Sequence, residues 1–510
     1  MILELDRQSH APLYTQIAAQ VRGLIERGVL KIGDRLPPNR ELAETLGVNR
    51  STVATAYDEL LADGLIAARV GSGTFVAAVP VAPLSLRTEA APSQRIAPLN
   101  WEAVLPELRP DEWLANRGTG RRKEGLSFTH ALPATELLPL DDFRRSVERV
   151  LRRDGRSLLQ LGASRGYEPL QQYLLQQMAL NGIRADADEI MLTNGCQQAL
   201  DLLRQTFLQP GDEVVIENPT YPGALSLFCQ PQYKFISVPV GARGLDLDAL
   251  EDVLRRRSPK LIYVVPTFHN PTGVTMDLAA RRRLLELAAQ YRVPIVEDEI
   301  YRELRYEGAA LPSLKALDQY GVVLYLNSFS KVAFPGLRVG WIIAPRLVIE
   351  HLHALKQRAD LHGNLLAQAA VADFARQGLL NKHIQRCRRN YAQRRDAMLM
   401  ALRQYFPHET TWTEPEGGMT LWLRLPAGVC ADELLTQAQM QGIYFTPGAR
   451  FYANRAKANT LRLSFTTVTQ AQLEEGLRRL GKLVEAQMAQ MKTAQPERLA
   501  QNTLVRKALV

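Results

Sequence analysis

A lysine, an arginine and two serines lie close together in one short stretch, Ser328-Phe-Ser-Lys-Val-Ala-Phe-Pro-Gly-Leu-Arg-Val-Gly340. Apolar runs of strand type precede and follow it, which predicts one connecting loop carrying Ser328, Ser330, Lys331 and Arg338. The lysine amine could form a Schiff base with an aldehyde, and the arginine fork could hold a phosphate beside the serine hydroxyls. Pyridoxal phosphate carries both groups. Short motifs also occur by chance in solvated loops, so the prediction depends on the rest of the chain.

Several predicted strands nearer the N-terminus each end beside a residue with useful chemistry. The strand Glu189–Thr193 leads into a helix whose first backbone N–H groups could bind a phosphate. Ligands in open α/β sheets bind outside the carboxyl ends of strands, so these residues are expected along one edge of a sheet. The candidates are Gly195, Cys196, Gln197, Tyr221, Asn270, Asp298 and Tyr301.

The candidates meet the separate needs of pyridoxal phosphate. Asp298 can keep the pyridine nitrogen protonated, so that the ring withdraws electrons. Asn270 and Tyr301 can hydrogen-bond the phenolate oxygen, and Tyr221 can stack on one face of the ring. The N–H groups of residues 195–197 would surround the phosphate together with Ser328, Ser330 and Arg338. Each residue alone has a simpler structural explanation, but a chain that fills every role in the right order favours a cofactor site.

Helical segments alternate with short Val- and Ile-rich strands from residue 126 to 485, which predicts an α/β domain with a mostly parallel central sheet. A polar tail, 486–510, is predicted to be a frayed helix or a disordered segment. Repeated prolines between residues 80 and 125 predict a linker with one short helix at 101–108. Arg121-Arg122-Lys123 near its end is interpreted as a solvated cluster, with contact to DNA phosphates as the alternative.

The first 79 residues predict three helices and a hairpin. Amphipathic helices are expected at 12–30, 36–46 and 50–63, and alternation around Gly71-Ser72-Gly73 predicts a β-hairpin over 64–76. The tight turn at Gly47-Val48 gives the helix-turn-helix layout of an α+β winged domain. The third helix could reach DNA phosphates and base edges through Asn49, Arg50, Ser51 and Thr52. The alternative is a small helical docking module with a hairpin.

Composition sets further limits. The chain has 510 residues, too many for one ordinary domain, with 46% hydrophobic and 23% charged residues. Its net charge of +9 suits an anionic partner only weakly, since acidic and basic residues nearly balance in the first 79 positions. The four cysteines show no C-x-x-C spacing, so neither a metal site nor disulfides are predicted. No membrane-spanning run or signal peptide is evident, so a cytoplasmic location is expected.

The N-terminal block resembles the winged helix of GntR-type transcription factors. The resemblance is carried by Leu36-Pro-Pro-Asn-Arg-Glu-Leu-Ala, Gly47-Val-Asn-Arg-Ser-Thr-Val and Gly71-Ser-Gly-Thr-Phe-Val. It implies a double-stranded DNA operator as partner, with Arg40, Arg50, Thr52 and Gly73 at DNA-contacting positions. Pro38-Asn39 replaces the more usual Ser-Glu or Ser-Ser, and both pairs suit a helix start.

Residues 126–485 resemble the fold-type I aminotransferases through Asn270-Pro-Thr-Gly, Asp298-Glu-Ile-Tyr, Ser328-Phe-Ser-Lys and Pro335-Gly-Leu-Arg-Val-Gly. Together the two resemblances are those of the MocR regulators. They imply a homodimer, pyridoxal phosphate on Lys331, and Arg462 as the group that grips the α-carboxylate of a ligand. Two features depart from the family: Leu161 stands where a tyrosine usually reaches the partner subunit's cofactor phosphate, and the segment 129–138 matches the early substrate loop only loosely.

These patterns favour a transcriptional regulator that binds DNA and pyridoxal phosphate and senses an amine, an amino acid or the cofactor itself. The alternative is a catalytically active aminotransferase with an accessory DNA-binding domain. Transamination is permitted by the presence of Asp298, Tyr301, Lys331, Arg338 and Arg462. A third interpretation, a dimerisation domain without cofactor, fits poorly with an intact lysine and its partners.

Overall fold

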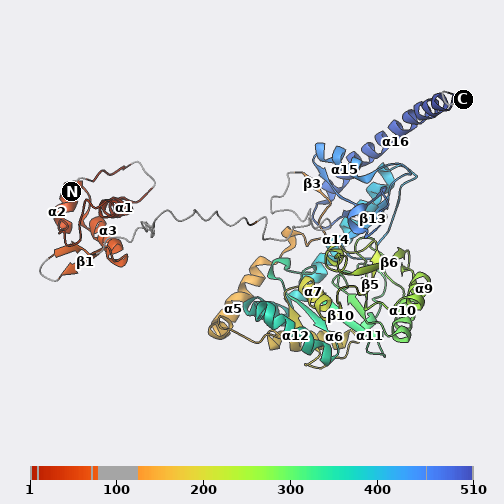
Figure 1. The fold of residues 1–510 in the computed structure, drawn as a ribbon, viewed down its shortest axis with the longest axis horizontal. Coiled ribbons are helices and arrows are strands. Elements are labelled where there is room, and N and C mark those ends of the chain that lie inside the picture. Colours follow the sequence, from red (N-terminus) through yellow and green to blue (C-terminus); the bar gives the residue numbers. More distant parts are fainter. Residues whose placement is uncertain are drawn as a thin grey trace, which may run out of the picture. The chain divides into compact units, whose positions relative to one another are not determined.

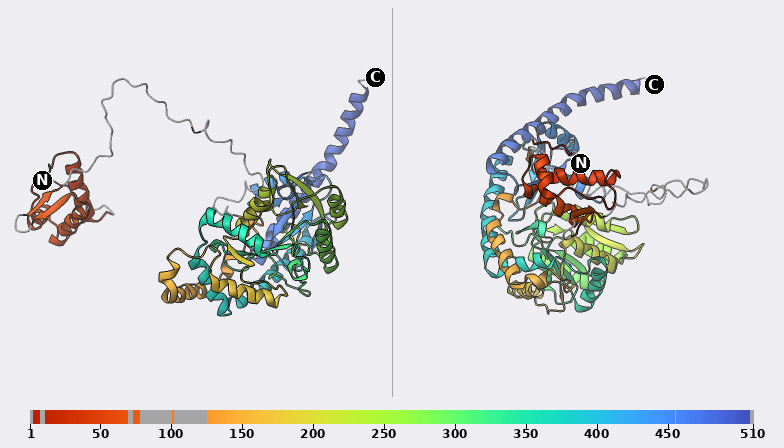
Figure 2. Two further views of the ribbon diagram at one scale, coloured as in Figure 1. Left: turned by 60° about the horizontal axis from the view of Figure 1, so that its bottom comes forward. Right: turned by 90° about the vertical axis from the view of Figure 1, so that its left-hand side faces the viewer.

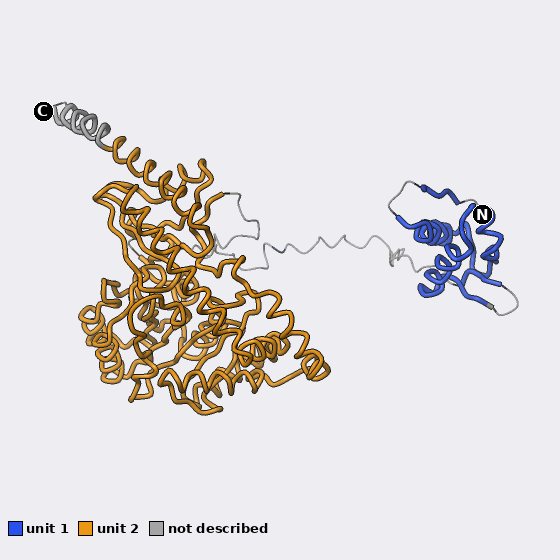
Figure 3. Tube along the Cα trace, turned by 180° about the vertical axis from the view of Figure 1, so that it is seen from behind, with its two compact units in different colours: residues 1–107 blue, residues 108–510 orange. Residues whose placement is uncertain are grey.

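The computed structural model describes residues 3–7, 11–69, 73–77, 101, 125–454 and 456–507, with side chains described as far as Met491. The chain divides into two compact units, residues 1–107 and 108–510 (Figures 1 and 3). The predicted linker, with its short helix and basic cluster, lies outside the described residues apart from Trp101 and Gly125. Among the helices that are described, none combines the length and apolar character needed to cross a membrane.

The N-terminal unit is a winged helix-turn-helix, as predicted. Its helices are α1 (Leu13–Glu26), α2 (Asn39–Leu46) and α3 (Arg50–Ala62), and its hairpin pairs β1 (Ile66–Arg69) with β2 (Gly73–Val76) in antiparallel register. Gly47 ends α2 in the left-handed region, at φ 62°, and the Asn49 side chain caps α3 by accepting from the N–H of Ser51. A core containing Ile17, Val21 and Leu60 holds the helices together.

The large unit is built on a sheet with the strand order β4-β11-β10-β9-β8-β5-β6-β7. β11 is antiparallel to both neighbours and β7 is antiparallel to β6, whereas the remaining pairs are parallel, as the sequence predicted. The strands are β4 (Ile190–Thr193), β5 (Glu213–Asn218), β6 (Lys234–Gly241), β7 (Gly244–Leu245), β8 (Leu261–Val264), β9 (Ile295–Asp298), β10 (Val323–Ser328) and β11 (Gly340–Ile343).

Side chains from this sheet alternate between two separate cores. Ile216 and Tyr263 point into one core, while their neighbours Val215 and Ile262 point into the other. Both faces are therefore buried, which explains the nearly continuous apolar strand sequences. The covering helices are α5 (Leu140–Leu158), α6 (Glu168–Leu180), α7 (Cys196–Phe207), α8 (Pro222–Phe228), α12 (Arg346–Asp360) and α13 (Leu365–Arg376) around the first core, and α9 (Leu247–Arg256), α10 (Leu278–Tyr291) and α11 (Leu314–Leu317) at the second (Figure 1).

A smaller antiparallel sheet completes the large unit, with the order β12 (Thr411–Trp412), β13 (Thr420–Arg424), β16 (Thr460–Ser464) and β15 (Thr446–Pro447). The first described strand of this unit, β3 (Leu126–Ser127), pairs in parallel with β14 (Ile443–Tyr444). The helices here are α14 (Leu379–Tyr405), α15 (Ala431–Met440) and α16 (Gln470–Lys507). α16 packs on α14 and runs as one helix past residue 485, where the sequence placed a boundary. Figure 2 shows the helix projecting from the rest of the unit.

Candidate functional site

The ends of the strands bring the predicted cofactor residues to one edge of the large sheet. Asp298 and Ser328 are the last residues of β9 and β10, and Cys196 begins α7 three residues after β4 ends. Since β4, β5, β8, β9 and β10 all run in the same direction, their carboxyl ends lie together. β10 ends at this edge and the antiparallel strand β11 begins there. The loop from Ser328 to Arg338 that joins them therefore lies at the same edge.

Residues 194–198 form the turn into α7 and its first residues, a segment that we call the cradle. Gly195 has φ 78°, and a Cβ at this position would collide with the guanidinium of Arg338. Arg338 Nη2 donates to the carbonyl of Asn194 at 3.2 Å. No described side chain caps the start of α7, so the N–H groups of Gly195, Cys196 and Gln197 are directed outward from a positive helix end.

The ring partners lie on neighbouring strands. One carboxylate oxygen of Asp298, Oδ2, accepts a hydrogen bond from the Tyr263 hydroxyl at 2.9 Å. The other oxygen, Oδ1, is buried and has no hydrogen-bond partner among the described residues. Burial raises the pKa of Asp298 from its ordinary 3.8 to about 6, and the hydrogen bond from Tyr263 opposes this rise. The carboxylate is therefore mostly ionised at neutral pH.

Lys331 and Arg462 both contact one segment of the chain, residues 129–132, which we call the strap. Lys331 Nζ donates to the carbonyl of Ala131 at 2.8 Å and lies 5.7 Å from the centre of the Tyr301 ring. Arg462 donates to the carbonyl of Thr129 and, at 3.0 Å, to Oδ1 of Asn270. The structure thus brings Asn270, Tyr301, Lys331 and Arg462 into one neighbourhood.

Tyr221 lies at the entrance of α8 beside the cradle. Its hydroxyl donates to Oε1 of Gln197 at 3.3 Å, and its ring lies so close to Gly223 that a Cβ there would collide with it. Ser328 Oγ accepts from the N–H of Ser330 at 3.2 Å, which shapes the loop before Lys331. Burial and the nearby Asp298 charge raise the pKa of the Cys196 thiol well above its usual range, so the thiol stays protonated.

Sequence reasoning missed Tyr263. It occupies the middle of β8, where every residue is buried, so its sequence is that of an ordinary core strand. Only the pairing of β8 with β9, in which Tyr263 lies opposite Val296, brings its hydroxyl to Asp298. A polar aromatic residue in an otherwise aliphatic strand is the one available indication, because a buried hydroxyl needs a partner.

The hydrogen bond between Tyr263 and Asp298 predicts a pH-dependent effect on stability. The folded pKa of Asp298, about 6, exceeds its ordinary 3.8, so ionising this carboxyl costs stability, with no cost below both values and the full cost above them. In the cofactor-free protein, Tyr263→Phe should therefore destabilise the large unit little at pH 5. Above pH 6 the loss should reach about 1.5–3 kcal/mol, since a charged acceptor loses its donor. Calorimetry from pH 5 to 8 measures the difference.

An Asp298→Asn background provides the control for this experiment, because its amide does not titrate. There the effect of Tyr263→Phe should be the same at every pH. A wild-type difference that does not grow between pH 5 and 8 would contradict the assigned hydrogen bond.

The donor set fits pyridoxal phosphate. A buried carboxylate oxygen without a partner among the described residues, Asp298 Oδ1, suits a protonated ring nitrogen. A glycine-shaped cradle with Arg338 beside it suits a phosphate, and the Lys331 amine lies in the same neighbourhood. Ser328, Ser330, Tyr221, Asn270 and Tyr301 would complete the set.

The predicted DNA residues form an exposed group on the N-terminal unit. Asn49, Arg50 and Ser51 at the start of α3 are exposed, and Thr52 is half-buried. Arg40 on α2 is 82% exposed and pairs with Glu44 at 3.2 Å, an exposed contact of small energy that DNA phosphates could replace. Gly73 begins β2, while the predicted wing turn at Gly71-Ser72 lies outside the described residues.

Sequence reasoning also missed Arg35 as a neighbour of the wing. Gly73 has φ 114°, and a Cβ there would come within 2.9 Å of Arg35 Nε. Arg35 precedes α2 and pairs with Phe75 in an isolated β-bridge. An exposed basic side chain at the base of the hairpin adds a candidate phosphate contact that only the folded hairpin reveals.

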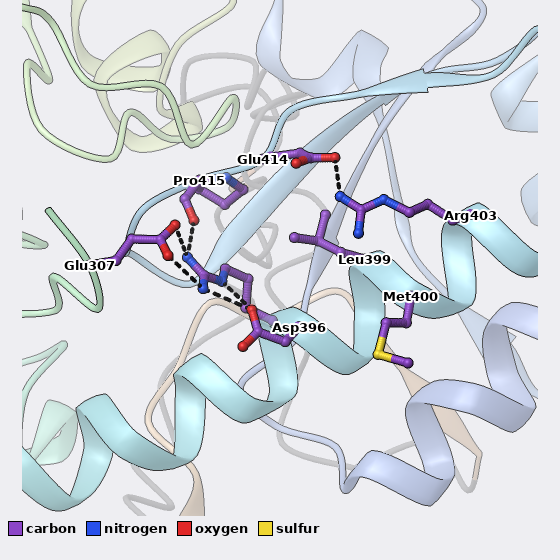
Figure 4. Close-up of a pocket in the computed structure, with 8 residues that line it drawn as sticks. Glu307, Asp396, Leu399, Met400, Arg403, Glu414 and Pro415 are labelled. Carbon is purple, nitrogen blue, oxygen red and sulfur yellow. Dashed lines mark hydrogen bonds and ion pairs between the residues drawn. The ribbon is translucent and has the colours of Figure 1, made fainter.

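A separate hollow of about 370 Å³ lies over α14 (Figure 4). Its charged groups are already matched: Arg395 contacts Glu307, Asp396 and the carbonyl of Pro415, and Arg403 contacts Glu414 at 2.7 Å. The predicted cofactor residues do not line it. It is therefore an ion-paired surface depression distinct from the candidate site.

The segment 161–168, where the sequence departs from the family, packs on α12 and α13. Leu161 is 80% exposed. The neighbouring Gly162 lies against Leu365, Ser164 bonds to His353, and the Tyr167 N–H donates to Oε1 of Gln368 at 2.7 Å. The exposed leucine is thus presented on a well-anchored turn.

Two family models match the chain. Residues 132–480 match aminotransferase class I and II, and residues 13–76 match the gntR family of bacterial regulatory proteins. A 2-aminoadipate transaminase of Thermus thermophilus is 41% identical over 71% of this chain and 91% of its own length. The probable rhizopine catabolism regulatory protein MocR of Rhizobium meliloti is 31% identical over 94% of this chain and 95% of its own length.

Solved structures give the same result for the large unit. The α-aminoadipate aminotransferase LysN of Thermus thermophilus, in complex with N-(5'-phosphopyridoxyl)-L-leucine, matches with a TM-score of 0.70 and 39% identity, covering 77% of this chain and all of LysN. A multiple substrate aminotransferase of Thermococcus profundus matches with a TM-score of 0.72 and 36% identity over 77% of this chain. The chain therefore belongs to the MocR-type regulators, in which a gntR-family DNA-binding domain is joined to a class I and II aminotransferase domain.

Proposed function

We propose that the protein is a one-component transcriptional regulator in which Lys331 holds pyridoxal phosphate and the large unit reports an amine or amino acid to the DNA-binding unit. Membership of both families supports the general function, a DNA-binding regulator that depends on pyridoxal phosphate. The cofactor, when bound, supplies an aldehyde that captures amines and a ring that withdraws electrons. We place the protein in the cytoplasm, where it can bind both the DNA and the cofactor.

Each residue of the site has a proposed task. Arg462, held by Asn270, would bind the carboxylate of an amino acid through its planar fork. Lys331 would yield its position to the ligand amine and could then carry a proton. Asp298 would hold the ring nitrogen, and Asn270 and Tyr301 the phenolate oxygen. The remaining phosphate and stacking contacts would come from Gly195, Cys196, Gln197, Ser328, Ser330, Arg338 and Tyr221.

The contacts of the strap support the proposal that ligand binding affects the DNA-binding unit. Its carbonyls at Thr129 and Ala131 accept hydrogen bonds from Arg462 and Lys331. The strap also follows β3, the first described strand after the stretch that joins the two units. A ligand that takes over the arginine and lysine removes these bonds from residues next to the connection. Ligand binding would thereby shift a conformational equilibrium that involves both the large unit and the DNA-binding unit.

A sensor gains from slow turnover, because a ligand that stays bound keeps one DNA affinity. We expect amino acids or amines that alter the visible absorption of the cofactor to alter operator affinity as well, while transamination remains slow or absent. The experiment combines steady-state assays against a panel of amino acids and a keto-acid acceptor with DNA titrations in the same ligands. Turnover of roughly 1–10³ per second with operator affinity indifferent to every ligand would favour the rival function, an aminotransferase.

We also propose that the large unit forms a homodimer. Supporting evidence comes from exposed leucines on neighbouring segments: Leu159, Leu161 and Leu361 expose 69%, 80% and 60% of their surfaces. Dimerisation would cover such side chains and complete a cofactor site of the kind seen at subunit interfaces. Sedimentation of the cofactor-loaded protein should give the mass of two chains. A monomer at micromolar concentration would contradict the proposal.

A further inference from the structure

A partly buried ion pair in the last turn of α12 contacts the cradle. Lys356 Nζ and Asp360 Oδ1 are 2.8 Å apart; the side chain of Lys356 is 1% exposed and that of Asp360 is 19% exposed. The second carboxylate oxygen, Asp360 Oδ2, accepts hydrogen bonds from Asn194 Nδ2 and Gln198 Nε2, both at 2.7 Å. One carboxylate therefore joins a lysine on α12 to two amides of the cradle.

Asn194 is the residue through which Asp360 acts on the cradle. Its N–H donates to Oε1 of Gln198 at 2.8 Å, and its carbonyl accepts from Arg338. The backbone of Gly363, just beyond α12, packs so tightly on the Asn194 side chain that a Cβ there would come within 3.0 Å of its Oδ1. The residue before Gly195 is thus fixed through its backbone and its side chain.

A carboxylate close to a phosphate site needs a reason, because like charges repel. Lys356 offsets the charge of Asp360, but burying the lysine and most of the carboxylate costs desolvation that an apolar pair would avoid. The carboxylate contributes by orienting its hydrogen-bond donors. It holds the side-chain amides of Asn194 and Gln198 in one orientation, and these two residues flank the three N–H groups that would face the phosphate.

We propose that Asp360 is a positioning residue for the phosphate cradle: by fixing Asn194 and Gln198, it keeps the N–H groups of residues 195–197 aimed at the phosphate. A loop held in its binding orientation does not lose conformational freedom when the ligand arrives, so affinity rises. The inference rests on the proposed function, since it takes the cradle to bind the phosphate of pyridoxal phosphate.

The test compares Asp360→Ala and Asp360→Asn with wild type in the full chain, using two probes, pyridoxal 5'-phosphate and pyridoxal. Binding is followed by the visible absorption of the cofactor. For pyridoxal phosphate, Asp360→Ala should weaken affinity about tenfold or more, the size of one charge-assisted hydrogen bond. The absorption maximum should not move, because Asp298 and Tyr301 are untouched. Asp360→Asn, which keeps one acceptor oxygen, should fall between. For pyridoxal, which has no phosphate, all three proteins should bind alike.

Asp373→Asn is the matched control. This carboxylate is more buried than that of Asp360, at 5% exposed, and pairs with Arg149 at 2.6 Å, but it lies on α13 and contacts α5. Its loss should lower the melting temperature without changing the affinity for either probe by more than about twofold. Equal affinity of Asp360→Ala and wild type for pyridoxal phosphate would overturn the inference. Equal losses for both probes, or in Asp373→Asn, would also overturn it. A wild type that binds neither probe would instead refute the proposed function.

Discussion

Replacing Lys331 by alanine is expected to abolish the absorption band of covalently attached pyridoxal phosphate, which the wild-type protein should show. The amine is the proposed point of attachment, and it lies beside Tyr301 and close enough to Asp298 for their charges to interact. Borohydride reduction of the wild type, followed by peptide mass spectrometry, should place the added mass on Lys331. A wild type that stays colourless with added cofactor would refute the assignment.

Two further substitutions sharpen this experiment. Lys331→Arg keeps the positive charge but removes the nucleophilic amine, so it too should lose the band. Lys382→Ala removes an exposed lysine of α14 and should keep it. A band retained in Lys331→Arg would show that attachment occurs elsewhere.

Loss of both Arg40 and Arg50 is expected to reduce operator affinity strongly, because both are exposed on the two helices of the helix-turn-helix. If Arg50 reads a guanine edge, Arg50→Ala should cost about 1–3 kcal/mol and relax specificity at one position. An arginine that contacts only phosphates should instead weaken all sequences alike and flatten the dependence of affinity on salt. Fluorescence anisotropy on a selected operator and a scrambled duplex, over a range of salt concentrations, separates the two cases.

Arg27→Ala provides the control for charge. Arg27 is exposed in the same unit, but it follows α1 instead of α2 or α3. It should alter operator binding little, apart from a small general loss. Operator affinity that is unchanged in the Arg40→Ala/Arg50→Ala pair would refute the assigned surface.

Patterns that act over a few residues predicted most of this fold. Asp298 and Ser328 could be placed at the ends of strands because a Val- and Ile-rich run followed by polar residues is a local pattern. The hairpin was predicted from its turn, and α3 begins at the predicted cap, Asn49. The first helix ends at Glu26 instead of Leu30, because Gly28 adopts a positive φ of 70°.

Contacts between segments far apart in the sequence could not be predicted from such local patterns. The Asn194–Asp360 bond joins residues 166 positions apart, and Tyr263 meets Asp298 only through the order of strands in the sheet. In the sequence, Lys356 and Asp360 are an ordinary pair at i and i+4 on a helix, which is usually a solvated pair. The burial of Lys356 and the bonds from Asp360 to the cradle are apparent only in the folded protein.

The second half of α12, the start of α13 and the turn between them contact both the cradle and the segment 161–168, which has a consequence for the response to ligand. Asp360 and Gly363 hold the cradle, while His353, Leu365 and Gln368 hold the segment 161–168. In a dimer where that segment lies beside the partner subunit's cofactor, α12 and α13 would link both phosphate sites. Filling the first site would then change the affinity of the second. Titrations would show cooperativity, and operator release would become a switch instead of a graded decline.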